Sequence, residues 1–274
     1  MTVGFIGTGN MATAIVRGVV ADGSLPASEI VVHDRNAHKC EALAEELGVR
    51  TAASPEELVD VADVVVLALK PQVLPSVVPG LAERIADRRR VVVSVAAGTS
   101  IERLEGLLAT TGGPGPVVRV MPNVNATVGE GCAAVAGNTA ASREDVELVL
   151  GMFRAVGEAW ELDESQFSAF TAIAGSAPAF AYLFVDSLAR GAVKAGMPKA
   201  LATSIAAQAV LGSARMVLES ESSPWDLIDT VCSPGGTTVA GLLALEDRGF
   251  LSTVVHGVSS TIARDKEIGA ASNG

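Results

Sequence analysis

The chain has 274 residues, of which 49% are hydrophobic, and a net charge of −11. This length and apolar content suffice for one large or two ordinary domains. The negative charge makes nucleic acids and anionic membrane surfaces poor partners, because both would repel the chain. The chain has three widely separated cysteines, which favours a reducing, cytoplasmic setting over a disulfide framework.

The histidines and cysteines do not form a metal-binding pattern. The spacing between histidines and cysteines matches no metal-ligand pattern, so we expect no metal site. These residues are His33, His38, His256, Cys40, Cys132 and Cys232. Cys232 stands beside Ser233 and could be a nucleophile, but no histidine is near in sequence. We therefore interpret Cys232 as a small buried packing residue.

A strand, a glycine motif and a helix open the chain. Val3–Ile6 is a short apolar run, and it enters Gly7-Thr8-Gly9-Asn10-Met11-Ala12, a G-x-G-x-x-A motif followed by helical spacing. The first glycine permits a tight turn, the second lets backbone amides approach a pyrophosphate, and the alanine still allows close helix packing. The amides and partial positive charge of the helix N-terminus explain how so acidic a protein would hold a dinucleotide.

A second apolar run, Ile30–His33, ends at Asp34-Arg35 about one βαβ unit later. An acid at this point commonly bonds the ribose 2′-hydroxyl of NAD, whereas an arginine accommodates the 2′-phosphate of NADP. Alternatively, Asp34 only caps the helix predicted over Ala37–Leu47, and Arg35 is a solvated cation. We favour NADPH, bound through Arg35, with NADH as the alternative.

The alternation of strands and helices continues to about residue 162. Val64–Leu69 is a continuous apolar strand of the kind buried in parallel sheets, and Lys70-Pro71 leaves its carboxyl end, where such sheets bind ligands. Small residues at Ala96-Ala97-Gly98 would let a flat ring lie against the backbone. Further strands are predicted over Val91–Val95, Val117–Met121, Cys132–Ala136 and Glu158–Leu162. Helices are predicted after Ser54, over Val73–Ile85, from a cap at Thr99 to Leu108, and from a cap at Ser142 to Val156.

From Glu164 onward no strand pattern is found. Ser165–Val185 carries no charge and is long enough to span a bilayer, but Gly175-Ser176-Ala177-Pro178 breaks it and no other segment matches it. We interpret it as the buried core of a subunit interface or helical domain. More helices are predicted over Ala200–Leu218, after Ser223 and around Leu251–Ile262. The fold class is therefore α/β: a Rossmann-type dinucleotide-binding domain over residues 1–163, then an all-helical dimerisation domain over residues 164–274.

The stretch Ser233-Pro234-Gly235-Gly236-Thr237-Thr238 indicates an ordered loop that opens a helix. Its hydroxyls stand where the first amides of a helix lack internal partners, and a small anion would fit there. The alternative is a plain Pro-Gly-Gly turn with a threonine as N-cap.

Together these motifs resemble those of the pyrroline-5-carboxylate reductase family, nearly from end to end. The matching segments are Gly4-Phe5-Ile6-Gly7-Thr8-Gly9-Asn10-Met11, Lys70-Pro71, Ala96-Ala97-Gly98, Met121-Pro122-Asn123, Gly175-Ser176-Ala177-Pro178-Ala179 and Ser233-Pro234-Gly235-Gly236-Thr237-Thr238. The resemblance implies reduction of the cyclic imine pyrroline-5-carboxylate to proline with NAD(P)H. It also implies homodimers, which in this family often assemble further as pentamers of dimers.

The resemblance implies residue roles as well. Thr238 matches the residue that contacts the ring nitrogen and is our catalytic candidate, while the amides around Gly236 and Thr237, with Ser233, would hold the carboxylate. Glu164 matches an acidic position near the substrate. Positions that match cofactor contacts are Gly7, Thr8, Gly9, Asn10, Met11, Leu69, Lys70, Pro71 and Ala97.

Five positions depart from the family pattern. Val124 and Asn125 follow Asn123 where Thr-Pro is common in the family. Phe180 stands where tyrosine is usual, and Pro55 stands where an asparagine often contacts the cofactor. Asp34 stands where asparagine or a small polar residue is usual. The changes at Val124 and Asn125 affect how the loop after Asn123 is ordered, and those at Pro55 and Asp34 affect how the cofactor is bound.

No histidine or paired carboxylate is visibly placed for acid catalysis, so we expect Thr238 to orient an imine that can arrive already protonated. Two alternatives remain. One is another NAD(P)-dependent imine or hydroxyacid reductase with Lys194 as the acid, which leaves the Ser233 loop without a role. The other is a dinucleotide-binding regulator without catalysis.

Overall fold

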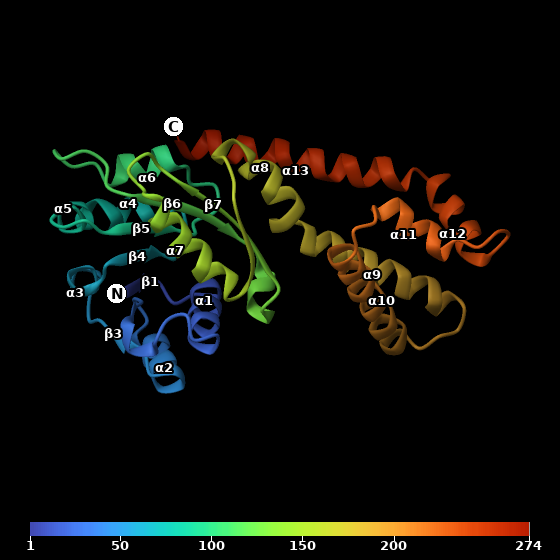
Figure 1. Ribbon diagram of the computed structural model, residues 1–274, viewed down its shortest axis with the longest axis horizontal. Coiled ribbons are helices and arrows are strands. Elements are labelled where there is room, and N and C mark those ends of the chain that lie inside the picture. Colours follow the sequence, from blue (N-terminus) through green and yellow to red (C-terminus); the bar gives the residue numbers. More distant parts are fainter. Residues whose placement is uncertain (274) are drawn as a thin grey trace. The chain divides into compact units, whose positions relative to one another are not determined.

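The computed structural model describes the backbone of residues 1–273 and the side chains of residues 1–270. An α/β part is followed by helices alone, as the sequence predicts (Figure 1). The chain divides into two compact units, the first formed by Met1–Gly175 with the segment from Thr261 onward, the second by Ser176–Ser260. The predicted boundary after residue 163 stays a prediction.

In the described residues the first unit contains one eight-stranded sheet of order β3-β2-β1-β4-β5-β6-β7-β8. All pairings are parallel except that of β6 with β7. All the predicted strands are present; β3 was not predicted. The strands are β1 (Val3–Ile6), β2 (Ile30–His33), β3 (Arg50–Thr51), β4 (Val64–Leu67), β5 (Val91–Ser94), β6 (Val117–Pro122), β7 (Gly131–Gly137) and β8 (Gly157–Glu161).

Two apolar cores cover the two faces of this sheet. Alternate side chains of β1 enter different cores: Val3 and Phe5 join the first, and Ile6 joins the second. Helices α1 (Asn10–Ala21), α2 (Ala37–Leu47) and α7 (Arg143–Arg154) close the first core; α3 (Pro55–Val61), α4 (Leu74–Val77), α5 (Ala82–Ala86) and α6 (Ile101–Leu107) close the second. The sheet is thus buried on both faces, as its continuous valine runs require.

Two helix predictions in this unit were wrong in detail. The single helix predicted over Val73–Ile85 is broken into α4, a 3₁₀ turn at Val78–Leu81 and α5, because Pro79 has no amide to donate. The cap of α6 is Ser100, which accepts a hydrogen bond of 3.1 Å from the amide of Arg103, whereas Thr99 is buried.

The route from the sheet to the second unit passes through a π-helical turn, Thr171–Gly175, which follows the short helix α8 (Phe167–Phe170). Asn123 supports this turn: its side-chain amide donates 3.0 Å to the carbonyl oxygen of Ala174, while its Oδ1 accepts 2.9 Å from the amide of Cys132. Pro178 lies in the first turn of the next helix, where proline is tolerated. The break that we predicted at Pro178 is therefore produced by the π turn.

The second unit consists of α9 (Ala177–Lys194), α10 (Lys199–Glu219), α11 (Pro224–Val231), α12 (Thr237–Glu246) and the beginning of α13 (Phe250–Asn273), which continues into the first unit. Buried alanines at Ala189, Ala202 and Ala206 let α9 and α10 pack closely. Phe184 and Phe250 lie in ring contact, with centroids 6.0 Å apart.

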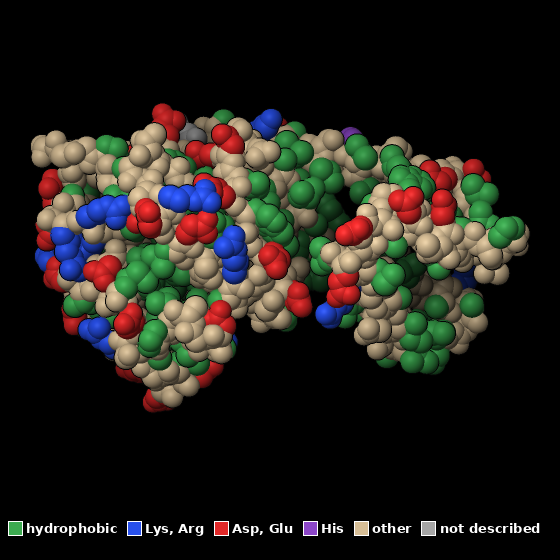
Figure 2. Space-filling model, viewed as in Figure 1, with side chains coloured by type: hydrophobic (Ala, Val, Ile, Leu, Met, Phe, Trp, Pro, Cys, Tyr) green, Lys and Arg blue, Asp and Glu red, His purple; other side chains and the backbone are tan. Residues whose placement is uncertain are grey.

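Much of the apolar surface of the second unit is exposed in the single chain (Figure 2). The large exposed side chains include Tyr182, Leu183, Leu201, Ile205, Leu211, Leu218, Trp225 and Leu243. By length and composition alone, two stretches could cross a membrane, Glu164–Lys194 and Lys199–Glu219. Our expectation that no segment matches the first stretch was therefore wrong. A helix with so much exposed apolar surface needs a covering partner.

Candidate active site

The glycine loop joins β1 to α1 between the first strand and the first helix. Gly7 has φ +100°, and a Cβ at this position would overlap the carbonyl oxygen of Ala68, so only glycine fits. Gly9 is the N-cap residue of α1, no side chain caps that helix, and the space around Gly9 is open. Unpaired amides beside open space fit the pyrophosphate of a dinucleotide.

The end of β2 is tied to this loop through Asp34. Its Oδ2 accepts a hydrogen bond of 2.8 Å from the amide of Thr8 and one of 3.2 Å from the Thr8 hydroxyl, while its Oδ1 accepts 3.0 Å from the amide of Asn36. Partial burial raises the pKa of Asp34, but these hydrogen bonds outweigh it and leave the pKa lowered. Asp34 does not cap α2, whose N-cap residue is Asn36. Arg35 is exposed at the same strand end.

The other predicted cofactor residues follow parallel strands next to β1. Leu69, Lys70 and Pro71 follow β4, and Ala97 follows β5. Since β1 has β2 on one side and β4 on the other, the strand order reverses here. Open α/β sheets bind ligands at the carboxyl ends of strands beside such a reversal. These residues and the glycine loop therefore follow the carboxyl ends of neighbouring strands, at one edge of the sheet.

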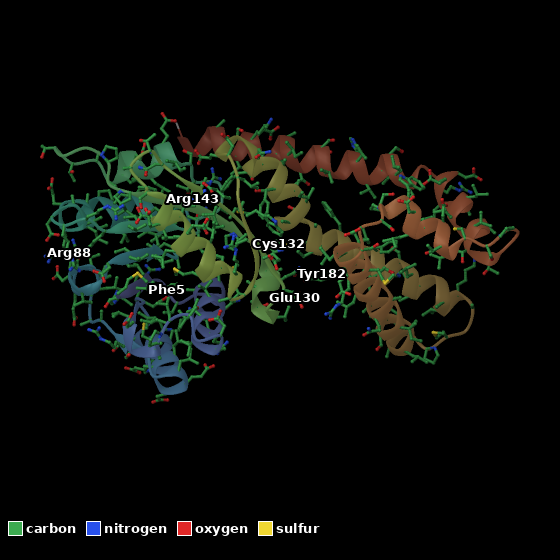
Figure 3. The ribbon with its side chains drawn as sticks, viewed as in Figure 1. Phe5, Arg88, Glu130, Cys132, Arg143 and Tyr182 are labelled. Atoms are coloured by element: carbon green, nitrogen blue, oxygen red, sulfur yellow. The ribbon has the colours of Figure 1, made fainter. Side chains whose placement is uncertain are left out.

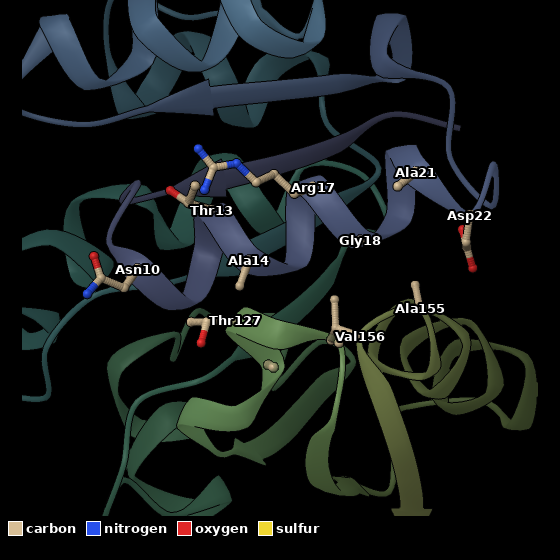
Figure 4. Close-up of a pocket in the computed structure, with 12 residues that line it drawn as sticks. Asn10, Thr13, Ala14, Arg17, Gly18, Ala21, Asp22, Thr127, Ala155 and Val156 are labelled. Carbon is tan, nitrogen blue, oxygen red and sulfur yellow. The ribbon is translucent and has the colours of Figure 1, made fainter. Parts of the chain in front are cut away.

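A groove of about 770 Å³ runs along α1 from Asn10 towards Ala155 and Val156 (Figure 4). Its one arginine, Arg17, is held by Glu46 through two hydrogen bonds of 2.7 Å. The groove therefore offers no unengaged arginine to an anion.

Glu164 lies in the first unit and is engaged by two donors. Its Oε1 accepts 2.7 Å from Nη1 of Arg119 and 2.8 Å from the amide of Ile101. The Arg119 guanidinium also lies 4.4 Å above the ring of Phe167. Arg119 was not predicted from the sequence; its one signal is a cation within an apolar strand.

The Ser233 loop lies in the second unit, between α11 and α12. Gly235 has φ +68°, and the amide of Gly236 donates 2.9 Å to the carbonyl oxygen of Ser233. Gly236 is the N-cap residue of α12 and no side chain caps this helix, so the threonine cap of the alternative interpretation is wrong. Thr237 and Thr238 are exposed in its first turn. Amides without a side-chain partner, beside two hydroxyls, suit a small carboxylate.

The remaining predicted positions are spread over several elements. Pro55 opens α3, Val124 and Asn125 lie in a 3₁₀ turn after β6, Phe180 is in α9, and Lys194 is the exposed last residue of α9. Within the described residues, no group of three or more His, Cys, Asp or Glu side chains could hold a metal ion.

A Rossmann-type sheet with a glycine loop at its strand reversal is the arrangement of dinucleotide-binding proteins, the class to which nicotinamide-dependent oxidoreductases belong. Two family models match the chain: one described as pyrroline-5-carboxylate reductase dimerisation over residues 164–268, the other as NADP oxidoreductase, coenzyme F420-dependent, over residues 2–98. The pyrroline-5-carboxylate reductase of Arabidopsis thaliana is 40% identical, covering 97% of this chain and 95% of its own.

Two solved structures agree with these matches. That of a pyrroline-5-carboxylate reductase from Coxiella burnetii is 33% identical with a TM-score of 0.92, covering 97% of this chain and 98% of its own. That of the Plasmodium falciparum pyrroline carboxylate reductase, with NADP bound, is 29% identical with a TM-score of 0.83, covering 98% of each chain. The chain belongs to the pyrroline-5-carboxylate reductase family. It is an NAD(P)H-dependent oxidoreductase that reduces the imine pyrroline-5-carboxylate to proline, which confirms the predicted family, fold class and activity.

Proposed function

We propose that two helix starts of this chain, those of α1 and α12, divide the work of this reaction. The glycine loop before α1 holds the dinucleotide, and the Ser233 loop before α12 holds the imine substrate. The observation that carries the proposal is that both helices begin without a side-chain cap, at a glycine N-cap residue. Each ligand brings the anionic group that such a helix start binds, a pyrophosphate to α1 and a carboxylate to α12.

On the substrate side, Ser233 and the amides around Gly236 and Thr237 bind the carboxylate, and the Thr238 hydroxyl bonds the ring nitrogen. Thr238 has only to orient the imine, because the substrate can arrive as its iminium. The bound nicotinamide supplies the hydride. Glu164 matches an acidic position near the substrate, and the hydrogen bonds that it accepts from Arg119 and Ile101 support a role in shaping the site.

On the cofactor side, Gly7 to Met11 bind the pyrophosphate, and Leu69, Lys70, Pro71 and Ala97 line the path of the dinucleotide. Arg35 pairs with the 2′-phosphate, so NADPH is the preferred cofactor and NADH the weaker one. Two observations support this preference: Arg35 is exposed while Asp34 is engaged by Thr8, and a relative has NADP bound.

We further propose a cytoplasmic homodimer without membrane contact, which can assemble into a pentamer of dimers. A second copy would cover the exposed apolar side chains of α9 and α10, and the family model for dimerisation spans both helices. Leu211→Glu, which places a charge on this surface, should shift the mass measured by light scattering from dimer to monomer. A control, Glu45→Gln in α2, should leave the mass unchanged.

The direct test is proline formation from pyrroline-5-carboxylate, followed with NADPH and NADH side by side. Turnover with a lower KM for NADPH is expected. Turnover of hydroxyacids, abolished by Lys194→Ala, would instead indicate the other reductase class. Cofactor binding without turnover of any imine would indicate a regulator.

A further inference from the structure

Arg119 is an unusual residue for its place in the sheet. It stands in β6 between Val118 and Val120, which are buried, and only 11% of its own side chain is exposed. A cation this far from water is destabilising unless it is paired. Glu164 provides the pairing at 2.7 Å, and the Phe167 ring covers the flat face of the guanidinium at 4.4 Å.

Glu164 also holds the start of α6. The oxygen that pairs with Arg119 accepts a hydrogen bond from the amide of Ile101, the first residue of that helix. This amide has no partner within the helix, and a carboxylate there is further stabilised by the helix dipole. One carboxylate oxygen therefore joins β6 to the N-terminus of α6.

The start of α6 bears directly on the proposed cofactor site. The loop Ala96–Ser100 runs from β5 into α6 and contains Ala97, a proposed contact of the nicotinamide end. A cavity of about 240 Å³ lies beside this loop and is lined by Gly98, Ser100, Arg119 and Glu164. Among the described residues, Ile268 is the one that lies within 4 Å of where a Cβ on Gly98 would stand, at 3.6 Å. Ala96 and Thr99 are buried and pack this loop against the core, and Glu164 adds a hydrogen bond where the loop enters α6.

We propose that Arg119 and Glu164 form a positioning pair, which fixes the Ala96–Ser100 loop for the nicotinamide half of the cofactor. Glu164 acts through the Ile101 amide, and Arg119 acts by holding Glu164. The inference rests on the proposed function and deepens it, because it assigns Glu164 to the cofactor loop instead of to a substrate atom. It adds Arg119 to the residues on which the reaction depends.

The test compares Glu164→Ala with Glu164→Gln. Alanine removes both accepted hydrogen bonds, so kcat should fall at least tenfold and NADPH affinity should fall, while affinity for 2′,5′-ADP stays within about twofold. The probe 2′,5′-ADP contains only the adenosine half, which the loop does not touch. Glutamine keeps an oxygen that accepts from Ile101 and Arg119 but removes the charge that pairs with Arg119, so Glu164→Gln should lower kcat clearly less than Glu164→Ala does. Arg119→Met should give a smaller fall than Glu164→Ala, because the Ile101 hydrogen bond remains.

The matched control is Arg143→Ala (Figure 3). Arg143 on α7 also forms an ion pair of 2.7 Å, with Glu161, but 68% of its side chain is exposed, so its loss should change neither kcat nor either affinity. Wild-type kcat and NADPH affinity in Glu164→Ala would overturn the proposal. Equal impairment of Glu164→Gln and Glu164→Ala would also overturn it, because the carboxylate would then act on the substrate itself. If the wild type does not reduce pyrroline-5-carboxylate, the proposed function fails, and the ratio of NADPH to 2′,5′-ADP affinity still decides the role of the pair.

Discussion

Thr8 donates two hydrogen bonds to one carboxylate oxygen of Asp34, 2.8 Å from its amide and 3.2 Å from its hydroxyl. The two residues follow the ends of the neighbouring strands β1 and β2. The carboxylate at the end of β2 is thus used to hold the glycine loop. In many Rossmann folds an acid at this point selects NAD by bonding the ribose. Under the proposed function, this engagement of Asp34 leaves Arg35 as the candidate that selects the cofactor.

Arg35→Ala should therefore raise KM for NADPH at least tenfold, about 1.4 kcal/mol, and leave KM for NADH within about twofold. The 2′-phosphate would lose its cation, whereas NADH has no such group. Asp34→Asn should raise both KM values by a similar factor, because it loosens the glycine loop that both cofactors use. Steady-state kinetics with each cofactor measure the four values. Equal losses for both cofactors in Arg35→Ala would contradict this assignment.

Thr238→Ala should lower kcat/KM for pyrroline-5-carboxylate at least tenfold, about 1.4 kcal/mol, with cofactor affinity unchanged. The lost hydroxyl is the proposed partner of the ring nitrogen. Thr230→Ala is the matched control, since the Thr230 hydroxyl donates 2.6 Å to the carbonyl oxygen of Leu227 within its own helix. Wild-type kinetics in Thr238→Ala would remove Thr238 from the mechanism.

Gly18→Ala should destabilise the first unit by about 1 to 3 kcal/mol through overpacking. A Cβ on Gly18, in the middle of α1, would overlap Val156 and lie 2.9 Å from the carbonyl oxygen of Ala155. Gly151→Ala in α7 is the control: nothing lies within 4 Å of its Cβ position, so the better helix propensity of alanine should raise stability by up to about 1 kcal/mol. Denaturant unfolding measures both. A stabilised Gly18→Ala variant would show that α1 can move away from Val156.

Asp145 should make stability depend on acid pH. It caps α7 together with Ser142 and pairs with Arg89; burial raises its pKa, but the hydrogen bonds from Arg89 and Ser142 outweigh this and leave the pKa lowered. A carboxyl whose folded-state pKa lies below its unfolded value, about 3.9, stabilises the fold above that pH and loses this contribution as pH falls through the folded-state pKa. Unfolding free energies at pH 7 and pH 3 should therefore differ less in Asp145→Asn than in the wild type.

The control for this pH effect is Glu161→Gln, which removes an exposed ion-pair partner of Arg143. It should keep the wild-type dependence on pH, since exposed pairs contribute little. An unchanged pH dependence in Asp145→Asn would assign the acid sensitivity to other carboxyls.

The features that the sequence predicted depend on neighbours along the chain. The G-x-G-x-x-A loop, the apolar strands and the caps at Ser54 and Ser142 each have a local signal, and each is present. The two-residue strand β3 has none, because Arg50 and Thr51 are exposed and follow no apolar pattern. Local signals also misled: Thr99 and Ser100 both precede a helix, and packing of Thr99 in the core leaves Ser100 as the cap.

The features that the sequence could not predict depend on residues distant along the chain. Arg119 and Glu164 are separated by 45 positions, and their pairing follows from the place of β6 in the sheet. The resemblance predicted Glu164 as a substrate contact. It gave no indication that the amide of Ile101 donates a hydrogen bond to Glu164. Likewise, the π turn at Thr171–Gly175 depends on Asn123, which reaches it from the end of β6.

The helix α13 belongs to both units, since its residues from Thr261 onward join the first. In chain order, the second unit is therefore an insertion inside the first. Loss of the part of α13 from Asp265 onward would remove Asp265, Lys266, Gly269 and Ala270 from the cavity beside Gly98. Damage to this late segment would thus impair the unit that the beginning of the chain forms.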